Sequence, residues 1–377
     1  METLAQIPHY GLSFLVLLTI LVFVHELGHY WVARRSGVRI EVFSIGFGPE
    51  LFGWNDRAGT RWKFSVLPLG GYVKMFGDAG AASTPGDGLD RMTAEERAVS
   101  FHHKRLAARA AIVAAGPAAN FLFAVVVLAG LFMTQGQPFT PPEVGTVAAG
   151  SAAEAAGVRP GDRIVEVDGS RIERFEEVQQ IVRLNQGTPL AVAVMRDGKR
   201  VELQATPRVV EIHDRIGGTQ RLGMLGIGRS GVEFVRRGPV DALVAGFDET
   251  ASLTVGTLTA VWQMVSGART ADELGGPLRI AQMSGEATRA GIAGFLWFAA
   301  ILSINLGLIN LFPIPMLDGG HLLFYAAEAV RGKPLGERAQ EYGFRIGLAL
   351  VLTLMIFATW NDLVQLRVFS FLKGLVT

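Results

Sequence analysis

A His-Glu-x-x-His pattern is the feature of this sequence most suited to chemistry. It reads His-Glu-Leu-Gly-His over residues 25–29 and lies in an apolar run, residues 10–33, whose only formal charge is Glu26. Residues four apart share one face of a helix, so His25 and His29 can hold one Zn²⁺ between them. Glu26 is placed to take a proton from a water molecule as a general base. The pattern therefore predicts a zinc site that performs hydrolysis.

The alternative interpretation is two histidines near a helix end, satisfied by backbone groups or water. Histidine is scarce, at 7 of 377 residues. Three ionisable side chains within five residues of a membrane-type helix are costly unless they have a function. These two facts favour the metal site.

The composition indicates a membrane protein that spans the bilayer several times and has a water-facing part. Half of the residues are hydrophobic, 18% are charged, and the mean hydropathy is +0.33. A net charge of +1 gives no general attraction to nucleic acid. The chain has no cysteine, so any zinc must be bound by histidine and carboxylate. The N-terminal run lacks the basic start and small-residue cleavage site of a signal peptide.

Four apolar segments are long enough to cross a bilayer, at residues 10–33, 110–142, 290–317 and 344–364. Basic residues follow the first and third segments and precede the second, which places those ends in the cytoplasm and the N-terminus outside. A further uncharged run at residues 250–267 is expected to lie on the membrane surface. A span there would put the C-terminal motif around Asp318 on the opposite side of the membrane from His25.

Residues 37–76 have the alternation and aromatic content of short strands, with a turn expected at Pro68–Gly71. Two interpretations remain open. One is a small cytoplasmic sheet, and the other is a hairpin that dips toward the site and offers an edge strand to an extended substrate.

The second segment contains the run Gly116-Pro117-Ala118-Ala119-Asn120. A proline inside a membrane helix predicts a kink, and we expect Asn120 to face the helix bundle in a packing role.

The third segment ends in a run of prolines, glycines and one aspartate. It reads Asn310-Leu-Phe-Pro313-Ile-Pro315-Met-Leu-Asp318-Gly-Gly-His321. The prolines should break the helix and turn Asp318 toward the bundle core. An aspartate at this depth is costly unless it is paired or metal-bound. We therefore predict Asp318 as the third ligand, ahead of His321, which lies beyond the glycine pair.

Residues 141–210 change character and carry the run Gly157-x-x-x-Gly161-Asp162-x-Ile-x-x-Val-Asp168-Gly169, followed by a helical stretch and two strands. This resembles a PDZ domain, a module that binds extended peptides or C-termini by β-augmentation. An equally weighted alternative is a spacer or size filter that binds no tail. The topology places this domain in a periplasm.

The N-terminal histidine motif, the PDZ-like domain and the C-terminal N-x-x-P-x-P-x-L-D-G run together resemble the site-2 protease family, most closely the bacterial regulator-of-sigma-E protease type. The resemblance implies one zinc ion held by His25, His29 and Asp318, with Glu26 as the catalytic base. It implies that Asn310, Pro313 and Pro315 help to hold the substrate. It also implies a re-entrant hairpin near Phe64–Met75, in which we assign Leu69, Gly70 and Gly71 to substrate binding.

The resemblance implies hydrolysis of peptide bonds inside single-span membrane proteins, such as anti-sigma factors already shortened by another protease, or remnant signal peptides. The best-known bacterial members have two PDZ domains, whereas this sequence has one. Two rival functions are a membrane adaptor with a vestigial metal motif and a metal transporter. Intact Glu26 and Asp318 argue against the adaptor. The few polar residues in the second and fourth segments argue against the transporter.

The predicted fold is thus a polytopic α-helical membrane protein of about four spans, with a membrane-associated β-hairpin and an inserted periplasmic PDZ-like α+β domain. Its expected divisions are an N-terminal membrane half, the PDZ-like domain, a periplasmic linker with an interfacial helix, and a C-terminal membrane half. They cover residues 1–140, 141–210, 211–288 and 289–377.

Overall fold

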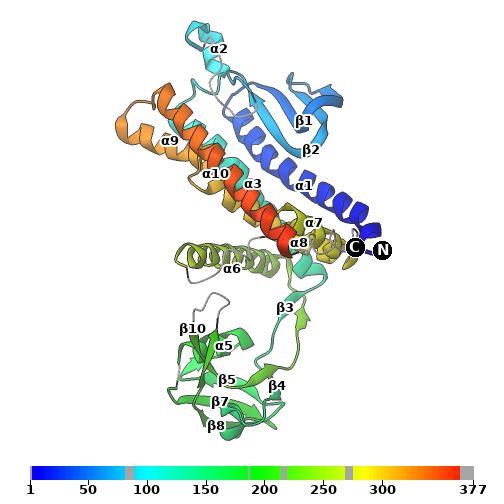
Figure 1. The fold of residues 1–377 in the computed structure, drawn as a ribbon, viewed down its shortest axis with the longest axis vertical. Coiled ribbons are helices and arrows are strands. Elements are labelled where there is room, and N and C mark those ends of the chain that lie inside the picture. Colours follow the sequence, from blue (N-terminus) through cyan, green and yellow to red (C-terminus); the bar gives the residue numbers. More distant parts are fainter. Residues whose placement is uncertain (1, 81–88, 186, 214–218, 268–274, 366–377) are drawn as a thin grey trace, which may run out of the picture. The chain divides into compact units, whose positions relative to one another are not determined.

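The computed structural model describes residues 2–80, 89–185, 187–213, 219–267 and 275–365. The chain forms two compact units (Figure 1), each described here by itself. The membrane unit comprises Met1–Leu131 and Ala242–Thr377, and the inserted unit comprises Phe132–Asp241.

Four helices are long and apolar enough to cross a bilayer, as the sequence predicts. They are α1 (Glu2–Arg35), α3 (Leu106–Thr134), α8 (Gly291–Leu311) and α10 (Glu337–Gln365). The other helices outside the inserted unit's core are η1 (Leu89–Arg91), α2 (Ala94–Val99), α6 (Pro239–Val265), α7 (Pro277–Arg289) and α9 (Asp318–Arg331). Within the described chain, α6 is not among the candidate spans.

The helix α1 is packed against two other spans. Leu17 and Leu21 form an apolar cluster with Phe298 and Ala299 of α8. Further along, α1 crosses α3 at Gly28, where an added Cβ would overlap the backbone carbonyl of Ala115. Such close crossings at small residues are typical of helices packed in membranes. The crossing brings the His25–His29 face of α1 directly against α3.

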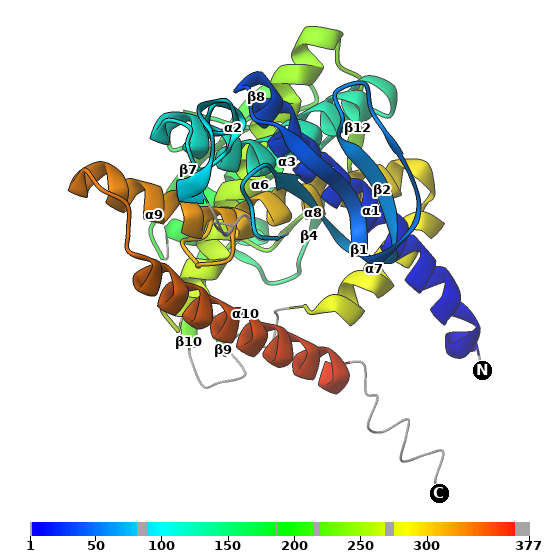
Figure 2. The ribbon, with the colours of Figure 1, turned by 90° about the horizontal axis from the view of Figure 1, so that it is seen from above.

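The predicted strands form one long antiparallel hairpin of β1 (Ile40–Asn55) and β2 (Arg61–Met75). Figures 1 and 2 both show this hairpin alongside α1. Its buried face contributes Phe43 and Val73 to an apolar cluster with Ala33 of α1 and Ile112 of α3. The hairpin is therefore fixed to the same two helices that meet at the histidine motif.

The expected turn at Pro68–Gly71 is wrong, because these residues lie inside β2. The chain reverses earlier, where the Asp56 carboxylate accepts hydrogen bonds from the backbone N–H groups of Ala58 and Thr60. The Gly and Pro residues of β2 instead fall where the pairing register shifts, between Ile45↔Gly71 and Phe47↔Leu67. Gly70 has a φ of 124°, which glycine adopts at little cost.

The helix breaks between α8 and α9, as the prolines in this segment predict. The helix α8 ends at Leu311, two residues before Pro313, because a residue that precedes proline disfavours helical backbone angles. The helix α9 then begins at Asp318 itself. A Cβ at Gly319 or Gly320 would overlap backbone carbonyls of the preceding turn, so only glycine lets α9 fold back this tightly.

The inserted unit contains a four-stranded antiparallel sheet in the order β6-β5-β7-β8. Its strands are β5 (Arg163–Val167), β6 (Ser170–Arg171), β7 (Leu190–Arg196) and β8 (Lys199–Ala205), and its helices are α4 (Ala152–Ala155) and α5 (Phe175–Leu184). The amphipathic α5 buries Val178 and Val182 in one apolar core with the sheet. This mixture of a small sheet and two helices is the α+β content predicted for the PDZ-like domain.

The inserted unit is wider than residues 141–210. Two further antiparallel pairs, β4 with β11 and β3 with β12, join segments from its two ends, and β9 pairs with β10, the next strand along the chain. These strands are β3 (Gln137–Phe139), β4 (Val144–Val147), β9 (Arg208–His213), β10 (Thr219–Met224), β11 (Ile227–Arg229) and β12 (Glu233–Val235). Pairing between β3 and β12 brings together the two chain segments that connect to the membrane unit.

Asp162 is expected to be the most sensitive polar residue of the inserted unit. Its carboxylate is 1% exposed and accepts two hydrogen bonds of 2.7 Å from Arg196. We expect Asp162→Ala to destabilise the unit by about 3 kcal/mol, because it breaks a buried ion pair. Burial alone would raise the pKa of Asp162, but hydrogen bonds from Arg196 and the backbone of Arg159 hold it below its usual value. The stabilisation that ionised Asp162 gives the folded unit should therefore be full at neutral pH and disappear as the pH falls below about 4.

Hydrogen exchange of the β5 and β7 amides in the full-length protein measures this effect. Arg200→Ala is the matched control, because Arg200 pairs with Glu166 of the same sheet but is 51% exposed. The control should change stability by less than about 1 kcal/mol. Equal protection of the amides in Asp162→Ala and in Arg200→Ala would contradict the assignment.

Candidate metal centre

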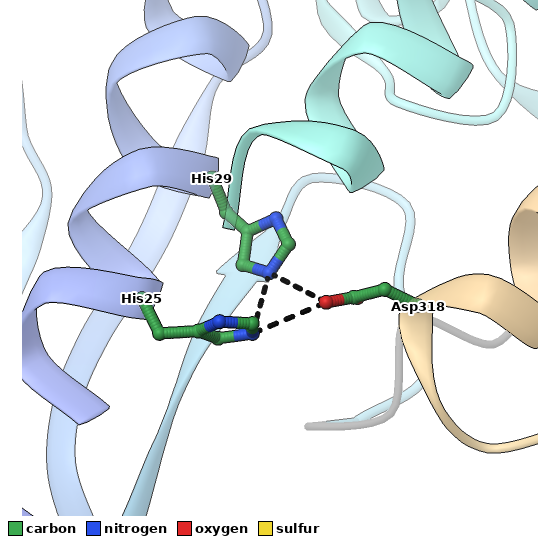
Figure 3. Close-up of side chains that lie close together, drawn as sticks. All are labelled: His25, His29 and Asp318. Atoms are coloured by element: carbon green, nitrogen blue, oxygen red, sulfur yellow. Dashed lines mark hydrogen bonds and ion pairs between the residues drawn. The ribbon is translucent and has the colours of Figure 1, made fainter. Parts of the chain in front are cut away.

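The two histidines and the predicted aspartate meet in the membrane unit (Figure 3). His25 and His29 project from one face of α1, and Asp318 reaches them from the first turn of α9. The His25 Nε2 atom lies 3.2 Å from His29 Nε2 and 3.2 Å from Asp318 Oδ2, and His29 Nε2 lies 3.6 Å from the same oxygen. His321 lies outside this group, with its ring 5.6 Å from that of Phe344 in α10.

These three atoms fit a zinc ion. In a tetrahedral site with zinc–ligand distances of 2.0–2.1 Å, neighbouring ligand atoms lie about 3.3 Å apart, close to the three distances observed. The Asp318 Oδ2 atom is buried and has no hydrogen-bond partner of good geometry within the described chain. A buried carboxylate oxygen that faces two imidazole nitrogens in this way is suited to a shared cation. His25, His29 and Asp318 are thus the residues that would hold the metal.

The helix α3 supports the His29 ring. His29 Nδ1 lies 2.8 Å from the backbone carbonyl of Ile112 in α3. Four residues later, a Cβ at Gly116 would overlap the His29 ring. Gly116 is therefore needed to make room for the imidazole. The Ile112 carbonyl can only accept, so Nδ1 donates and Nε2 is left free to bind a metal.

Asn120 lies one helical turn beyond Gly116 and reaches the other histidine. Its side chain is fully buried, and its amide lies 3.1 Å from His25 Nδ1. The packing role predicted for Asn120 is present, since its backbone carbonyl accepts a hydrogen bond from Ser303 of α8. Contact with His25 is not predicted by the sequence analysis. The spacing of Gly116 and Asn120 gives a usable signal, because residues four apart share a helix face just as His25 and His29 do.

Glu26 lies between the histidines and the hairpin. Its carboxylate lies near the backbone of Val73 in β2. A Cβ at Gly71 would lie 3.5 Å from Glu26 Cγ and 2.9 Å from Val22 Cγ1, so β2 passes directly over this part of α1. Gly70 is half-buried beside it, whereas the side chain of Leu69 lies outside the part that the structure describes.

The residues of the C-terminal run lie close to Asp318 along the chain but contact other groups. Asn310 is half-buried in the last turn of α8, and Pro313 is exposed. Pro315 packs against α10, where a Cβ at Gly347 would overlap its carbonyl oxygen. No hydrogen bond in the described chain joins Asn310 to either histidine.

Comparison with known proteins agrees with this site. The family model described as peptidase family M50 matches residues 13–354. A protein of Rhizobium meliloti named as a candidate zinc metalloprotease is 49% identical over 356 residues, which cover 93% of this chain and 95% of that protein. Metalloprotease MmpA of Caulobacter vibrioides is 42% identical over 389 residues, which cover 97% of this chain and 98% of that protein.

Among solved structures, the PDZ domain of the SdrC-like protein of Listeria innocua matches 25% of this chain and 98% of that domain. The two are 19% identical, with a TM-score of 0.20. Because the family model spans most of the chain and relatives match over nearly all of it, the predicted site-2 protease membership is confirmed: the chain belongs to peptidase family M50 and is a zinc metalloprotease of the membrane.

Proposed function

We propose that this protease, of the regulator-of-sigma-E protease type, hydrolyses peptide bonds within the transmembrane segments of single-span proteins. The observation that supports the proposal is the convergence of His25, His29 and Asp318 beside Glu26, with both histidines and Glu26 on α1, a helix apolar enough to cross a bilayer. A soluble metalloprotease would not be expected to contain four helices that are apolar enough to cross a bilayer.

We assign the chemical roles from the geometry. His25, His29 and Asp318 hold one zinc ion, which when bound polarises the scissile carbonyl and makes water a better nucleophile near neutral pH. Glu26 takes the proton from the attacking water and returns it to the leaving amine. The reaction needs no acyl-enzyme.

We assign substrate binding to β2 and to the turn before Asp318. Within the described chain the hairpin is a two-stranded sheet, so each strand has one unpaired edge to which an extended segment can add. Leu69, Gly70 and Gly71 lie in β2, where Gly71 passes close to Glu26, and Asn310, Pro313 and Pro315 precede Asp318 in the chain. Of the two interpretations of the hairpin, its contact with Glu26 supports the substrate-binding one.

The proposed setting is a bacterial inner membrane. The basic residues at the ends of the spans favour an active site toward the cytoplasm and an inserted unit in the periplasm. The substrates are then anti-sigma-factor-like proteins shortened outside the membrane, or remnant signal peptides. The inserted unit either binds a peptide or excludes untrimmed proteins. The lipid bilayer is a partner throughout, and nucleic acid is not.

Metal removal distinguishes this function from its rivals. Treatment of the purified protein with a zinc chelator should abolish cleavage of a tagged single-span substrate, and added zinc should restore it. An adaptor would keep its partner binding and show no cleavage before treatment. A transporter would move zinc into sealed vesicles at a rate that Glu26→Gln leaves unchanged, so that result would contradict the proposal.

A further inference from the structure

The two imidazoles of the metal centre are both supported from α3, but by partners of different kinds. His29 faces a backbone carbonyl, Ile112 C=O at 2.8 Å, which fixes the proton on Nδ1. His25 faces the side-chain amide of Asn120 at 3.1 Å, and an amide can present either a donor or an acceptor. The protonation of His25 is therefore set by which way the Asn120 amide turns.

In the structure the amide nitrogen of Asn120 faces His25 Nδ1, while its Oδ1 atom is buried without a hydrogen-bond partner in the described chain. This orientation places the His25 proton on Nε2, the atom that points at Asp318. A proton on Nε2 is incompatible with a metal bound there. Zinc at Nε2 requires the proton on Nδ1, where it would meet the donor face of the amide.

A half-turn of the amide resolves this conflict, because its oxygen and nitrogen exchange places. Oδ1, the atom now without a partner, then accepts from His25 Nδ1–H, and Nε2 is free for the metal. A ligating histidine almost always donates its other ring N–H to an oxygen in this way.

The Asn120 backbone is held in position while the amide turns. Its carbonyl accepts a 2.9 Å hydrogen bond from the buried Ser303 hydroxyl of α8. Gly307 of α8 packs beside it, since a Cβ there would lie 3.3 Å from Asn120 Cβ. Contacts from α8 thus anchor the residue and leave its amide directed at His25.

We propose that Asn120 is a positioning residue of the zinc centre, whose amide oxygen accepts a hydrogen bond from His25 Nδ1–H when zinc is bound. This inference rests on the ligand set of the proposed function. Asn120 acts through His25 and touches neither zinc nor substrate.

The test is the zinc affinity of the full-length protein in detergent, measured by competition with a colorimetric chelator. Asn120→Leu removes the hydrogen bond at similar size and should weaken zinc binding 10–100-fold, the range for lost outer-shell partners. Asn120→Asp supplies an acceptor only and should bind zinc at least as tightly as the wild type. Ser303→Ala removes the anchor of the Asn120 backbone without reaching His25, and should stay within about threefold of the wild type.

Two outcomes overturn the role of Asn120 alone: wild-type affinity in Asn120→Leu, or equal losses in Asn120→Leu and Asn120→Asp with both proteins folded. If His29→Ala also binds zinc like the wild type, the metal centre and the role of Asn120 are both wrong. Nitrogen-15 spectra of histidine-labelled wild-type protein provide a test that no folding defect can obscure. Loading with zinc should place the His25 proton on Nδ1, and zinc bound at Nδ1 would overturn the proposal.

Discussion

Glu26→Gln is expected to lower kcat for cleavage of a single-span substrate by about 10²–10⁴-fold while leaving the zinc content at one ion per chain. Glutamine has nearly the same shape as glutamate but cannot take a proton from water. Glu26 follows His25 directly but is not one of the three residues that converge on the metal position, so its replacement by glutamine should not open the zinc site. A fall in kcat with unchanged KM would place the defect in the chemical step.

A matched control for Glu26→Gln is Glu41→Gln on the hairpin. Glu41 pairs with Lys74 at 2.9 Å and both side chains are about one-third exposed. The control should change kcat by less than about threefold, since exposed ion pairs contribute little. Cleavage by Glu26→Gln at the wild-type rate would show that another group is the base. Loss of zinc in the same variant would show that Glu26 is a ligand.

Asp318→Ala is expected to weaken zinc binding by more than about 100-fold, and cleavage should disappear with the metal. We expect at least this loss because removing even an outer-shell partner weakens metal binding 10–100-fold, and we propose Asp318 as one of three direct ligands. Zinc content after dialysis against a weak chelator measures the effect. His321→Ala is the control one turn further along α9, and it should retain zinc. Loss of zinc in His321→Ala with retention in Asp318→Ala would reverse the assignment.

The position of Asp318 depends on a turn whose backbone allows few substitutions. Met316 has a φ of 88°, a conformation that costs a non-glycine residue about 1–3 kcal/mol. Gly319 and Gly320 lie against backbone carbonyls of the preceding turn. Further along α9, Glu328 forms a partly buried ion pair with Arg109 of α3. The start of α9 is thus held by backbone packing, and its later turns by the helix that also supports both histidines.

The sequence predicts the proposed zinc ligands because each is a polar or ionisable residue in or beside a long apolar segment, where such residues are rare. Charged or polar groups are rare in membrane helices, so the histidine motif and Asp318 stand out against their apolar surroundings. The four spans are predictable for the related reason that a bilayer demands long apolar runs. Their ends are less certain from sequence. The uncharged run at residues 110–142 continues past the end of α3 at Thr134 into β3, because lack of charge alone does not distinguish helix from a buried strand.

What the sequence does not predict depends on distant parts of the chain. The Pro68–Gly71 run has the composition of a turn, but it lies inside β2, where its pairing with β1 is interrupted by a bulge. Asn120 has the composition of a packing residue, and its contact with His25 arises only where α1 crosses α3 at Gly28. The inserted unit extends beyond residues 141–210 because β3 pairs with β12, about 95 residues later in the chain.

The most direct test of the account is the mass of the products released from a purified single-span substrate. We predict one new pair of termini, located within the apolar segment of the substrate, formed by the wild type and absent with Glu26→Gln. The two product masses should sum to that of the substrate plus one water. A cut found only in the water-exposed part of the substrate, or an intramembrane cut that Glu26→Gln still makes, would contradict the account.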